Sequence, residues 1–286
     1  MQTTNQAPAL SQSSPHIRTK RAGEISHAVS PPPLLDGLQL NYGPIPEIGR
    51  FLLAADAALM RRGVRLSLGT ISDLIAIQQE NEVSWPILAP NLDSRYADIG
   101  THNSYCLIGR NTAGRVVATQ AGRIYALGQH SLSQLIDTGQ FLSAQHSNAD
   151  APSFRISSPS AQTLIGSLNY SGALWVAPEF RGRQLASLLP RISRTYALGQ
   201  WDTDATFTFV RGGAAQAKLL AAYGYERWEP GLEIWRGGQL AAEAGLTWLT
   251  RSELIADMNA VRLRLVSEID RAVNVGSRNH ILTAVS

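Results

Sequence analysis

Apolar positions recur along the chain with helical and strand periods in alternation. Apolar residues three or four apart predict helices over 45–60, 70–81, 185–198, 214–223 and 250–257, the last continuing toward 270. Alternating or continuous apolar runs predict strands over 64–68, 104–109, 115–127, 170–176, 206–210, 225–235 (or a bent hairpin) and 246–249. The turn Asn111-Thr112-Ala113-Gly114 joins two of them into a β-hairpin. A hairpin followed by strand–helix–strand–helix–strand predicts an α/β fold with a mixed, mostly antiparallel sheet flanked by helices.

Two of the predicted helices begin with a capping box, in which a Thr side chain and a carboxylate three residues later satisfy each other's backbone N–H groups. Thr70 and Asp73 form a weaker version of this motif, and Thr250 and Glu253 form the usual one. These pairs fix two helix starts from local sequence alone.

Two segments depart from the alternating pattern. Residues 1–36 are rich in Ser, Gln, Thr and Pro, a composition that predicts a flexible tail. Residues 128–168 form a polar insertion in which a short helix is expected near 132–142. We therefore expect a tail over 1–36 and a single domain over 37–286, with that insertion and a C-terminal helical extension.

Composition excludes several classes of protein. Hydrophobic residues make up 44% and charged residues 16%, as in globular domains. No apolar run approaches the roughly 18 residues that cross a bilayer, so we expect a cytoplasmic protein without membrane partners. Cys106 is the only cysteine, which excludes an internal disulfide and a multi-cysteine metal site, and no metal is expected. A net charge of +3 without interleaved basic and aromatic residues gives no indication of nucleic-acid binding.

The stretch LWVAPEFRGRQLASLLPRI, residues 174–192, joins an apolar strand to a helix through a doubly basic turn. Pro178 ends the strand, and the helix is expected to open just after Phe180. The first N–H groups of a helix lack partners and carry positive potential, to which Arg181 and Arg183 add two charges. The turn is therefore either a phosphate or pyrophosphate seat or a solvated basic cap on a core helix.

The segment VAPEFRGRQLASLLPRISRTYAL resembles the acyl-CoA-binding motif of the GNAT superfamily of N-acetyltransferases. The residues that fit the motif are Arg181, Gly182, Arg183, Leu185 and Ala186, whereas Gln184 stands where the motif has its central glycine. The later segment LLAAYGYERW is similar to the family's helix end, where a Gly-aromatic pair starts the next strand. The resemblance covers roughly residues 63–250.

The resemblance implies that acetyl-CoA, or another acyl-CoA, is the co-substrate. The strand before the turn is then splayed from its neighbour, and the backbone of Leu174, Trp175 and Val176 pairs with the pantetheine arm. The N–H groups of Arg181 to Ala186, including that of Gln184, take the pyrophosphate. The partner it implies is a small-molecule or peptide amine acceptor. A homodimer through the C-terminal helix is a further possibility.

The residues expected to move protons are less well defined. At the position where the family often has a proton-donating tyrosine the chain has Leu220, and Gly213 replaces an early asparagine of the same helix. Tyr223 is then a candidate acid, with a packed aromatic as the alternative. Glu179 is a candidate base acting through water, with an exposed charge at a helix start as the alternative.

The remaining polar or reactive residues are expected to be structural. Tyr170 and Cys106 are expected to pack in the sheet, and His130 and His146 to be bystanders in the insertion. Because the usual tyrosine and glycine are missing, a non-catalytic CoA-binding or regulatory module with the same fold stays open. An enzyme that uses longer acyl donors is the third hypothesis.

Overall fold

The seven predicted strands and one unpredicted strand form one eight-stranded sheet in the computed structural model, which describes residues 32–142 and 151–283. These residues fall within one compact unit, Pro31–Ser286. The helices are α1 (Ile45–Arg61), α2 (Ile71–Glu80), α3 (Leu132–Asp137), α4 (Leu185–Trp201), α5 (Gln216–Tyr223) and α6 (Arg251–Thr283). The strands are β1 (Arg65–Gly69), β2 (Ser104–Arg110), β3 (Val116–Gly128), β4 (Ser153–Ile156), β5 (Gly166–Val176), β6 (Ala205–Val210), β7 (Glu229–Arg236) and β8 (Gln239–Thr250).

The strand order across the sheet is β1-β2-β3-β5-β6-β8-β7-β4. Neighbouring strands run antiparallel except β5 and β6, which are parallel. The expected mixed, mostly antiparallel sheet is therefore confirmed. Its single parallel pair lies at the centre, where a helix, α4, crosses over between the two strands as parallel pairing requires.

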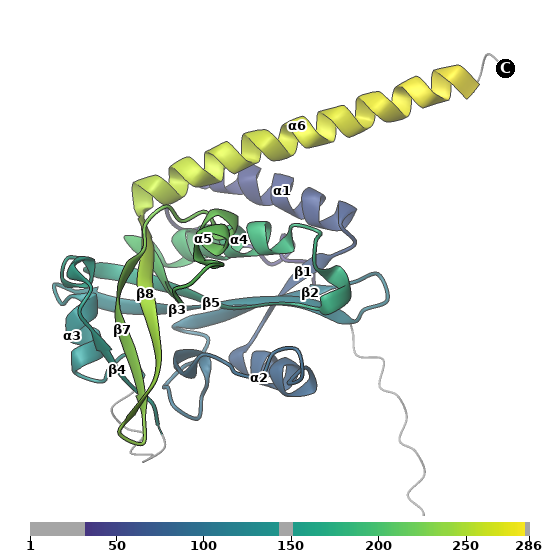
Figure 1. The fold of residues 1–286 in the computed structure, drawn as a ribbon. Helices are drawn as coiled ribbons and strands as arrows, with labels where there is room; N and C mark the ends of the chain where they lie inside the picture. The colour runs from purple at the N-terminus through teal and green to yellow at the C-terminus, as the bar shows by residue number, and fades with distance from the viewer. Residues whose placement is uncertain (1–31, 143–150, 284–286) are drawn as a thin grey trace, which may run out of the picture. The chain divides into compact units, whose positions relative to one another are not determined.

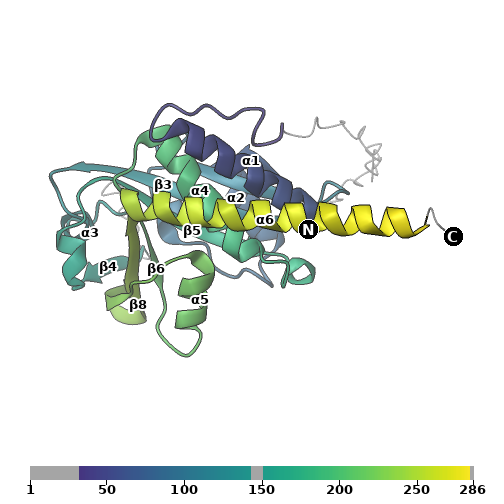
Figure 2. The same cartoon turned by 90° about the horizontal axis from the view of Figure 1, so that it is seen from above.

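Helices cover both faces of the sheet (Figure 1). One face carries α1, α4, α5 and α6, and α2 lies on the other. Seen from above, α6 runs beside α1 and over α4 (Figure 2). The core between α4 and the sheet is closed by apolar side chains such as Leu107, Val117 and Leu189, each less than 1% exposed.

Both predicted capping boxes are confirmed. The Thr70 Oγ1 accepts from the Asp73 N–H at 3.2 Å, and the Asp73 carboxylate accepts from the Thr70 N–H at 2.8 Å. At the start of α6, the Thr250 N–H donates to the Glu253 carboxylate at 2.9 Å, and the Glu253 N–H to Thr250 Oγ1 at 3.4 Å. The helix that begins there is longer than its pattern predicted, because it continues past Asp270 to Thr283.

The strands predicted from the sequence pattern differ from the observed strands at the β4–β7–β8 edge of the sheet. Within the expected insertion, the short helix is α3, which ends at Asp137, and the segment 153–156 is an unpredicted strand, β4, paired with β7. The predicted strands 225–235 and 246–249 are parts of the long hairpin β7–β8, which turns at Gly237-Gly238. A strand of four residues is too short to show a recognisable alternation of apolar and polar residues. Its place in the sheet is set by pairing with β7.

The expected tail lies almost wholly outside the described residues, as does His146. Its last residues are described, and there Leu34 is 3% exposed and donates its N–H to the Leu66 carbonyl at 2.8 Å. The folded part therefore includes Leu34, three residues before the expected boundary at residue 37.

Candidate functional site

The central parallel strands pair over only part of their length. β5 and β6 are in register at Leu168–Ala205, Asn169–Thr206 and Tyr170–Phe207, and no pairing follows. β5 nevertheless runs on to Val176 and β6 to Val210. The two strands thus diverge toward their carboxyl ends, as the resemblance implied, and leave backbone edges that face a gap.

An irregularity in β5 lies within this divergent stretch. Against β3, Thr119 faces Trp175 but Ala121 faces Gly172, so β5 has one more residue than its partner there. Ala173 lies in this bulge with φ 55°, and its carbonyl accepts from Thr119 Oγ1 at 3.0 Å. A bulge bends a strand and increases its twist, which explains why β5 leaves β6 at this point.

The backbone of Val176 faces the gap. The neighbouring Ala177 N–H donates to the Val117 carbonyl of β3, at 2.9 Å, and backbone groups alternate sides along a strand. The Val176 N–H and carbonyl therefore point away from β3, toward β6. Arg181 Nε donates to that carbonyl at 3.3 Å, so a ligand that pairs with Val176 has to displace this contact.

The turn after β5 delays the start of the helix. Residues Pro178–Phe180 form a 3-10 turn, Gly182 has φ 80° and Gln184 has φ 60°, and α4 begins at Leu185. The expectation that the helix opens just after Phe180 is wrong, because two left-handed residues cannot continue a right-handed helix. The extra turn lengthens the loop that precedes the helix.

The N–H groups of this turn point to no protein acceptor. Within 32–142 and 151–283, no carbonyl or side chain accepts a hydrogen bond from the N–H groups of residues 182–186. Residues 181–184 are exposed, so water or an anion can reach these groups. Five consecutive free donors at a helix start form the electrostatic environment that phosphate prefers.

The basic side chains of the turn fold back onto the protein. Arg183 donates to the Arg62 carbonyl at 3.1 Å and lies over the Phe180 ring at 4.1 Å. A cavity of about 550 Å³ adjoins the turn, lined by Arg61, Arg62, Gly182, Arg183, Gln184 and Glu268. The Glu268 carboxylate, from α6, contacts Arg62 Nη2 at 3.4 Å and not the turn N–H groups. Among the described residues, no carboxylate fills the bend.

The two candidate proton-transfer residues lie in different surroundings. Glu179, on the 3-10 turn, is exposed and forms an ion pair with Arg115 of the β2–β3 hairpin. Backbone hydrogen bonding at Glu179 and the Arg115 guanidinium lower the pKa of its carboxyl, which weakens it as a base. Tyr223 ends α5, and burial raises its pKa. Its carbonyl accepts from Arg194, about 13 Å along α4 from Leu185.

A tyrosine that the pattern assigned to packing lies at the apex of the gap. Tyr170 forms the last β5–β6 pair and is 7% exposed, as expected of a packed residue. Its ring lies under Gly172, where an added Cβ would come 3.0 Å from the hydroxyl oxygen. Burial raises the pKa of Tyr170 to about 12, and a hydrogen bond with Thr208 of β6 opposes the rise. Leu220, in the family's tyrosine position, is buried.

Other singled-out residues lie in the core or away from the turn. Trp175 is 4% exposed, stacks on Trp85 at 6.0 Å and donates to Ser84 Oγ at 3.0 Å, and its backbone faces Thr119 of β3, so neither its ring nor its backbone faces the gap. Cys106 is fully buried, and burial raises the pKa of its thiol, as expected of a core cysteine. His130 is exposed near the end of β3.

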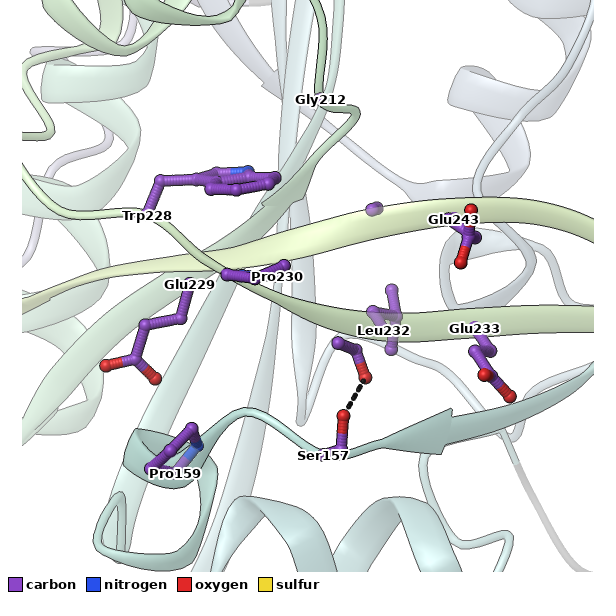
Figure 3. Close-up of a pocket in the computed structure, with 11 residues that line it drawn as sticks. Ser157, Pro159, Gly212, Trp228, Glu229, Pro230, Leu232, Glu233 and Glu243 are labelled. Atoms are coloured by element: carbon purple, nitrogen blue, oxygen red, sulfur yellow. Dashed lines mark hydrogen bonds between the residues drawn. The ribbon is translucent and has the colours of Figure 1, made fainter.

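A second cavity, of about 780 Å³, borders the carboxyl end of β6 at Gly212 (Figure 3). Trp228 forms one wall and donates to the Val210 carbonyl at 3.0 Å. Glu233 and Glu243 lie directly opposite each other on β7 and β8 and line the same cavity. The two carboxylates bring negative charge to this cavity, and Arg155 of β4, which lies opposite Glu233 on its other side, offsets part of it.

Comparisons with known proteins give structural likeness without sequence likeness. No family model matches the chain. No curated protein matches it in sequence. Among solved structures, NAA60 of Arabidopsis thaliana in complex with acetyl-CoA matches with 16% identity and a TM-score of 0.41, over 65% of this chain and 99% of that one. The aminoglycoside acetyltransferase AAC(6')-Ib with coenzyme A and kanamycin matches with 12% identity and a TM-score of 0.38, over 66% and 96%. RimJ of Mycobacterium smegmatis with CoA-disulfide matches with 12% identity and a TM-score of 0.38, over 69% and 88%.

These matches are distant, and the fold assignment rests on the chain's own topology. The hairpin β2–β3, the splayed strand β5, the turn into α4 and the succession β6, α5 and β7 follow one another as the motif resemblance implied. The described residues thus form an α/β fold with a mixed, mostly antiparallel sheet flanked by helices. In the described part of the chain, no helix is long and apolar enough to span a bilayer. No group of three or more His, Cys, Asp or Glu residues is placed to hold a metal ion within the described ranges.

Proposed function

We propose that the chain is an acyl-CoA-dependent N-acyltransferase that in its simplest form transfers an acetyl group from acetyl-CoA to a primary amine. One observation carries this proposal: a strand edge that has left its neighbour leads directly into five unpaired N–H groups at the start of α4. A free strand edge pairs with amides, and such a helix start binds a diphosphate. The pantetheine arm and pyrophosphate of CoA offer these two groups in succession.

The residues of the turn fit that ligand. Gly182 has no Cβ and nothing within 4 Å of where one would lie, so a phosphate can approach the backbone there. Gln184, at the motif's glycine position, has φ 60°, a left-handed conformation that glycine would adopt without strain. Val176 would hold the arm through its backbone, flanked by Leu174 and by Trp175, whose own backbone faces β3. Arg181 and Arg183 would add charge near the phosphates.

The reaction needs the amine nitrogen to attack the thioester carbonyl, so that a C–N bond forms, the C–S bond breaks and the thiolate accepts a proton. We assign the proton donor to Tyr170, because its hydroxyl lies at the apex of the gap and its raised pKa of about 12 keeps it protonated at neutral pH. Tyr223 is the alternative donor. Glu179 would accept the amine proton through water, although its ion pair with Arg115 makes it a weak base.

The acceptor that we propose is a small-molecule or peptide amine in the cytoplasm. The cavity beside Gly212 supports a cationic acceptor, since Glu233 and Glu243 gather negative charge at the same end of β6 at which the gap opens. Protonated amines are concentrated by such a field and lose a proton before they react.

Two other functions share the same binding geometry. A non-catalytic CoA-binding module is favoured by the apolar Leu220 in the usual acid position. An enzyme for longer acyl chains would need a wider channel between β5 and β6 than acetyl requires. A homodimer stays a prediction for any of the three.

Calorimetric titration of the purified full chain with CoA, acetyl-CoA and a medium-chain acyl-CoA tests binding. Release of free thiol from the bound acyl-CoA, with a panel of cationic and neutral amines, tests transfer. Binding with amine-dependent thiol release supports the enzyme, and binding without release by any amine supports the module. A chain that binds none of the three CoA compounds contradicts the proposal.

A further inference from the structure

The turn at the start of α4 contains a residue in a conformation that its side chain disfavours. Gln184 has φ 60° and ψ 20°, in the left-handed region that residues with a Cβ rarely adopt. Such a residue persists only when its surroundings over-determine it. The side chain that contacts Gln184 lies 122 positions earlier in the chain.

Arg62, at the C-terminal cap of α1, contacts the turn at two points. Its Nε donates to the Arg183 carbonyl at 3.0 Å, and its Nη2 donates to Gln184 Oε1 at 3.2 Å. The first contact fixes the peptide that precedes Gln184, and the second fixes its side chain. Together they determine the rotation about the Gln184 N–Cα bond, which is the torsion that carries the strain.

The guanidinium of Arg62 is itself held in place. Its side chain is 16% exposed, and its Nη1 donates to the Ala58 carbonyl inside α1 at 2.8 Å. In return, Arg183 Nη1 donates to the Arg62 carbonyl at 3.1 Å. The planar fork of an arginine spans these acceptors at once, which the single ammonium of a lysine cannot do.

We propose that Arg62 is a positioning residue for the diphosphate-binding turn: it holds Gln184, which stands where the motif has glycine, in a left-handed conformation and thereby presets the N–H groups of residues 182–186. This inference rests on the proposed function, since it explains how that site works without its central glycine. Arg62 acts through Arg183 and Gln184 and need not touch the ligand. The motif's glycine and the pair Arg62–Gln184 are two solutions to one backbone requirement.

Two substitutions at position 184 separate backbone conformation from side-chain contact. Gln184→Ala and Gln184→Gly both remove the amide that Arg62 holds, but only glycine adopts φ 60° without strain. We expect Gln184→Ala to bind CoA about tenfold more weakly than Gln184→Gly, because fewer of its turns are in the competent conformation. Equal dissociation constants for the two variants, measured by calorimetry, would overturn the proposal.

The coupling to Arg62 is tested by a double-mutant cycle with CoA affinity as the readout. Arg62→Met should weaken CoA binding about tenfold in the parent chain and less than about threefold in the Gln184→Gly background. Arg62→Lys should resemble Arg62→Met if the fork rather than the charge matters. Arg61→Met removes the same charge one residue earlier, and its effect should be equal in both backgrounds. An equal loss for Arg62→Met in both backgrounds contradicts the inference.

A readout without CoA distinguishes failure of this inference from failure of the proposed function. Amide hydrogen exchange at residues 182–186 should be faster in Arg62→Met than in Arg61→Met, and adding Gln184→Gly to Arg62→Met should slow it again, because glycine adopts the left-handed conformation without Arg62. If the parent chain binds no CoA, the proposed function fails. If the parent chain binds CoA, but Arg62→Met changes neither the amide exchange rates of residues 182–186 nor the CoA affinity, only the positioning role fails.

Discussion

Arginine is used in opposite ways at two places along α4. In the middle of the helix, Arg191 and Arg194 are 5% and 1% exposed and share the Asp257 carboxylate of α6, at 2.9 and 3.0 Å. They also donate to the carbonyls of Ala222 and Tyr223 at the end of α5, each at 2.7 Å. At the start of the helix, by contrast, arginines surround backbone donors that have no described acceptor.

The two regions differ in whether their polar groups have partners within the protein. The paired groups stabilise the fold, and the unpaired N–H groups are available to bind a ligand. Around Asp257 the buried charges are paired and most of their donors are satisfied, which ties α4, α5 and α6 together. At the turn, Arg62 satisfies acceptors of the loop and leaves its N–H donors free. Satisfied polar groups contribute to stability, whereas free donors contribute to binding once an anion reaches them. Substitutions in the two regions should therefore fail in different ways.

The largest effect is expected in the middle of α4. Asp257→Ala leaves Arg191 and Arg194 buried without a counter-charge and should lower the free energy of unfolding by about 3–5 kcal/mol in chemical denaturation. Glu47→Ala is the matched control, because its pair with Arg50 on α1 is exposed and should be worth less than about 1 kcal/mol. Equal losses in the two variants would remove the distinction between the regions.

The second prediction concerns the two tyrosines. Tyr170→Phe removes the hydroxyl at the apex of the gap and should lower kcat at least about 100-fold, with little change in the KM for acyl-CoA. Tyr223→Phe removes a hydroxyl at the end of α5 and leaves the carbonyl that accepts from Arg194 in place, so kcat should stay nearly unchanged. Because burial raises the Tyr170 pKa to about 12, activity should not fall through loss of this proton below that pH. A large loss of kcat in Tyr223→Phe and a small one in Tyr170→Phe would identify Tyr223 as the proton donor.

A valine at Gly182 tests the backbone of the turn. Gly182 has φ 80° and free space where a Cβ would lie, so Gly182→Val introduces strain without a clash. It should cost about 1–2 kcal/mol of stability and weaken CoA binding about tenfold. Gly139→Val is the control, with φ 74°, the same free space and a place after α3. A similar loss of stability with unchanged CoA affinity is expected for it, measured by denaturation and calorimetry.

The smallest effect is expected from Glu268. Its carboxylate contacts Arg62 and lines the cavity beside the turn, where it opposes the approach of a phosphate. Glu268→Gln should tighten CoA binding about two- to threefold at low ionic strength, and salt should reduce the gain. Glu80→Gln, an exposed position on α2, should leave the affinity unchanged. Weaker CoA binding in Glu268→Gln would show that this carboxylate supports the turn instead.

The sequence by itself determined the elements and the place of the site. The hairpin, the two capping boxes and the end of β5 at Pro178 are set by neighbours in the chain, and such contacts leave a readable pattern. The basic turn and its resemblance to the acyl-CoA motif then predicted the gap between β5 and β6, which the strand pairing confirms.

Only the tertiary structure decided how the turn is held. The bulge at Ala173, the edge strand β4 and the left-handed Gln184 are decided by partners far away in sequence, and no local period records them. Arg62 lies 122 positions before Gln184, and its spacing predicts only a helix end. Folding brings the two together because α1 packs beside α4. A glycine specifies its backbone conformation through its own chemistry, whereas a glutamine in that place depends on a neighbour that the fold supplies.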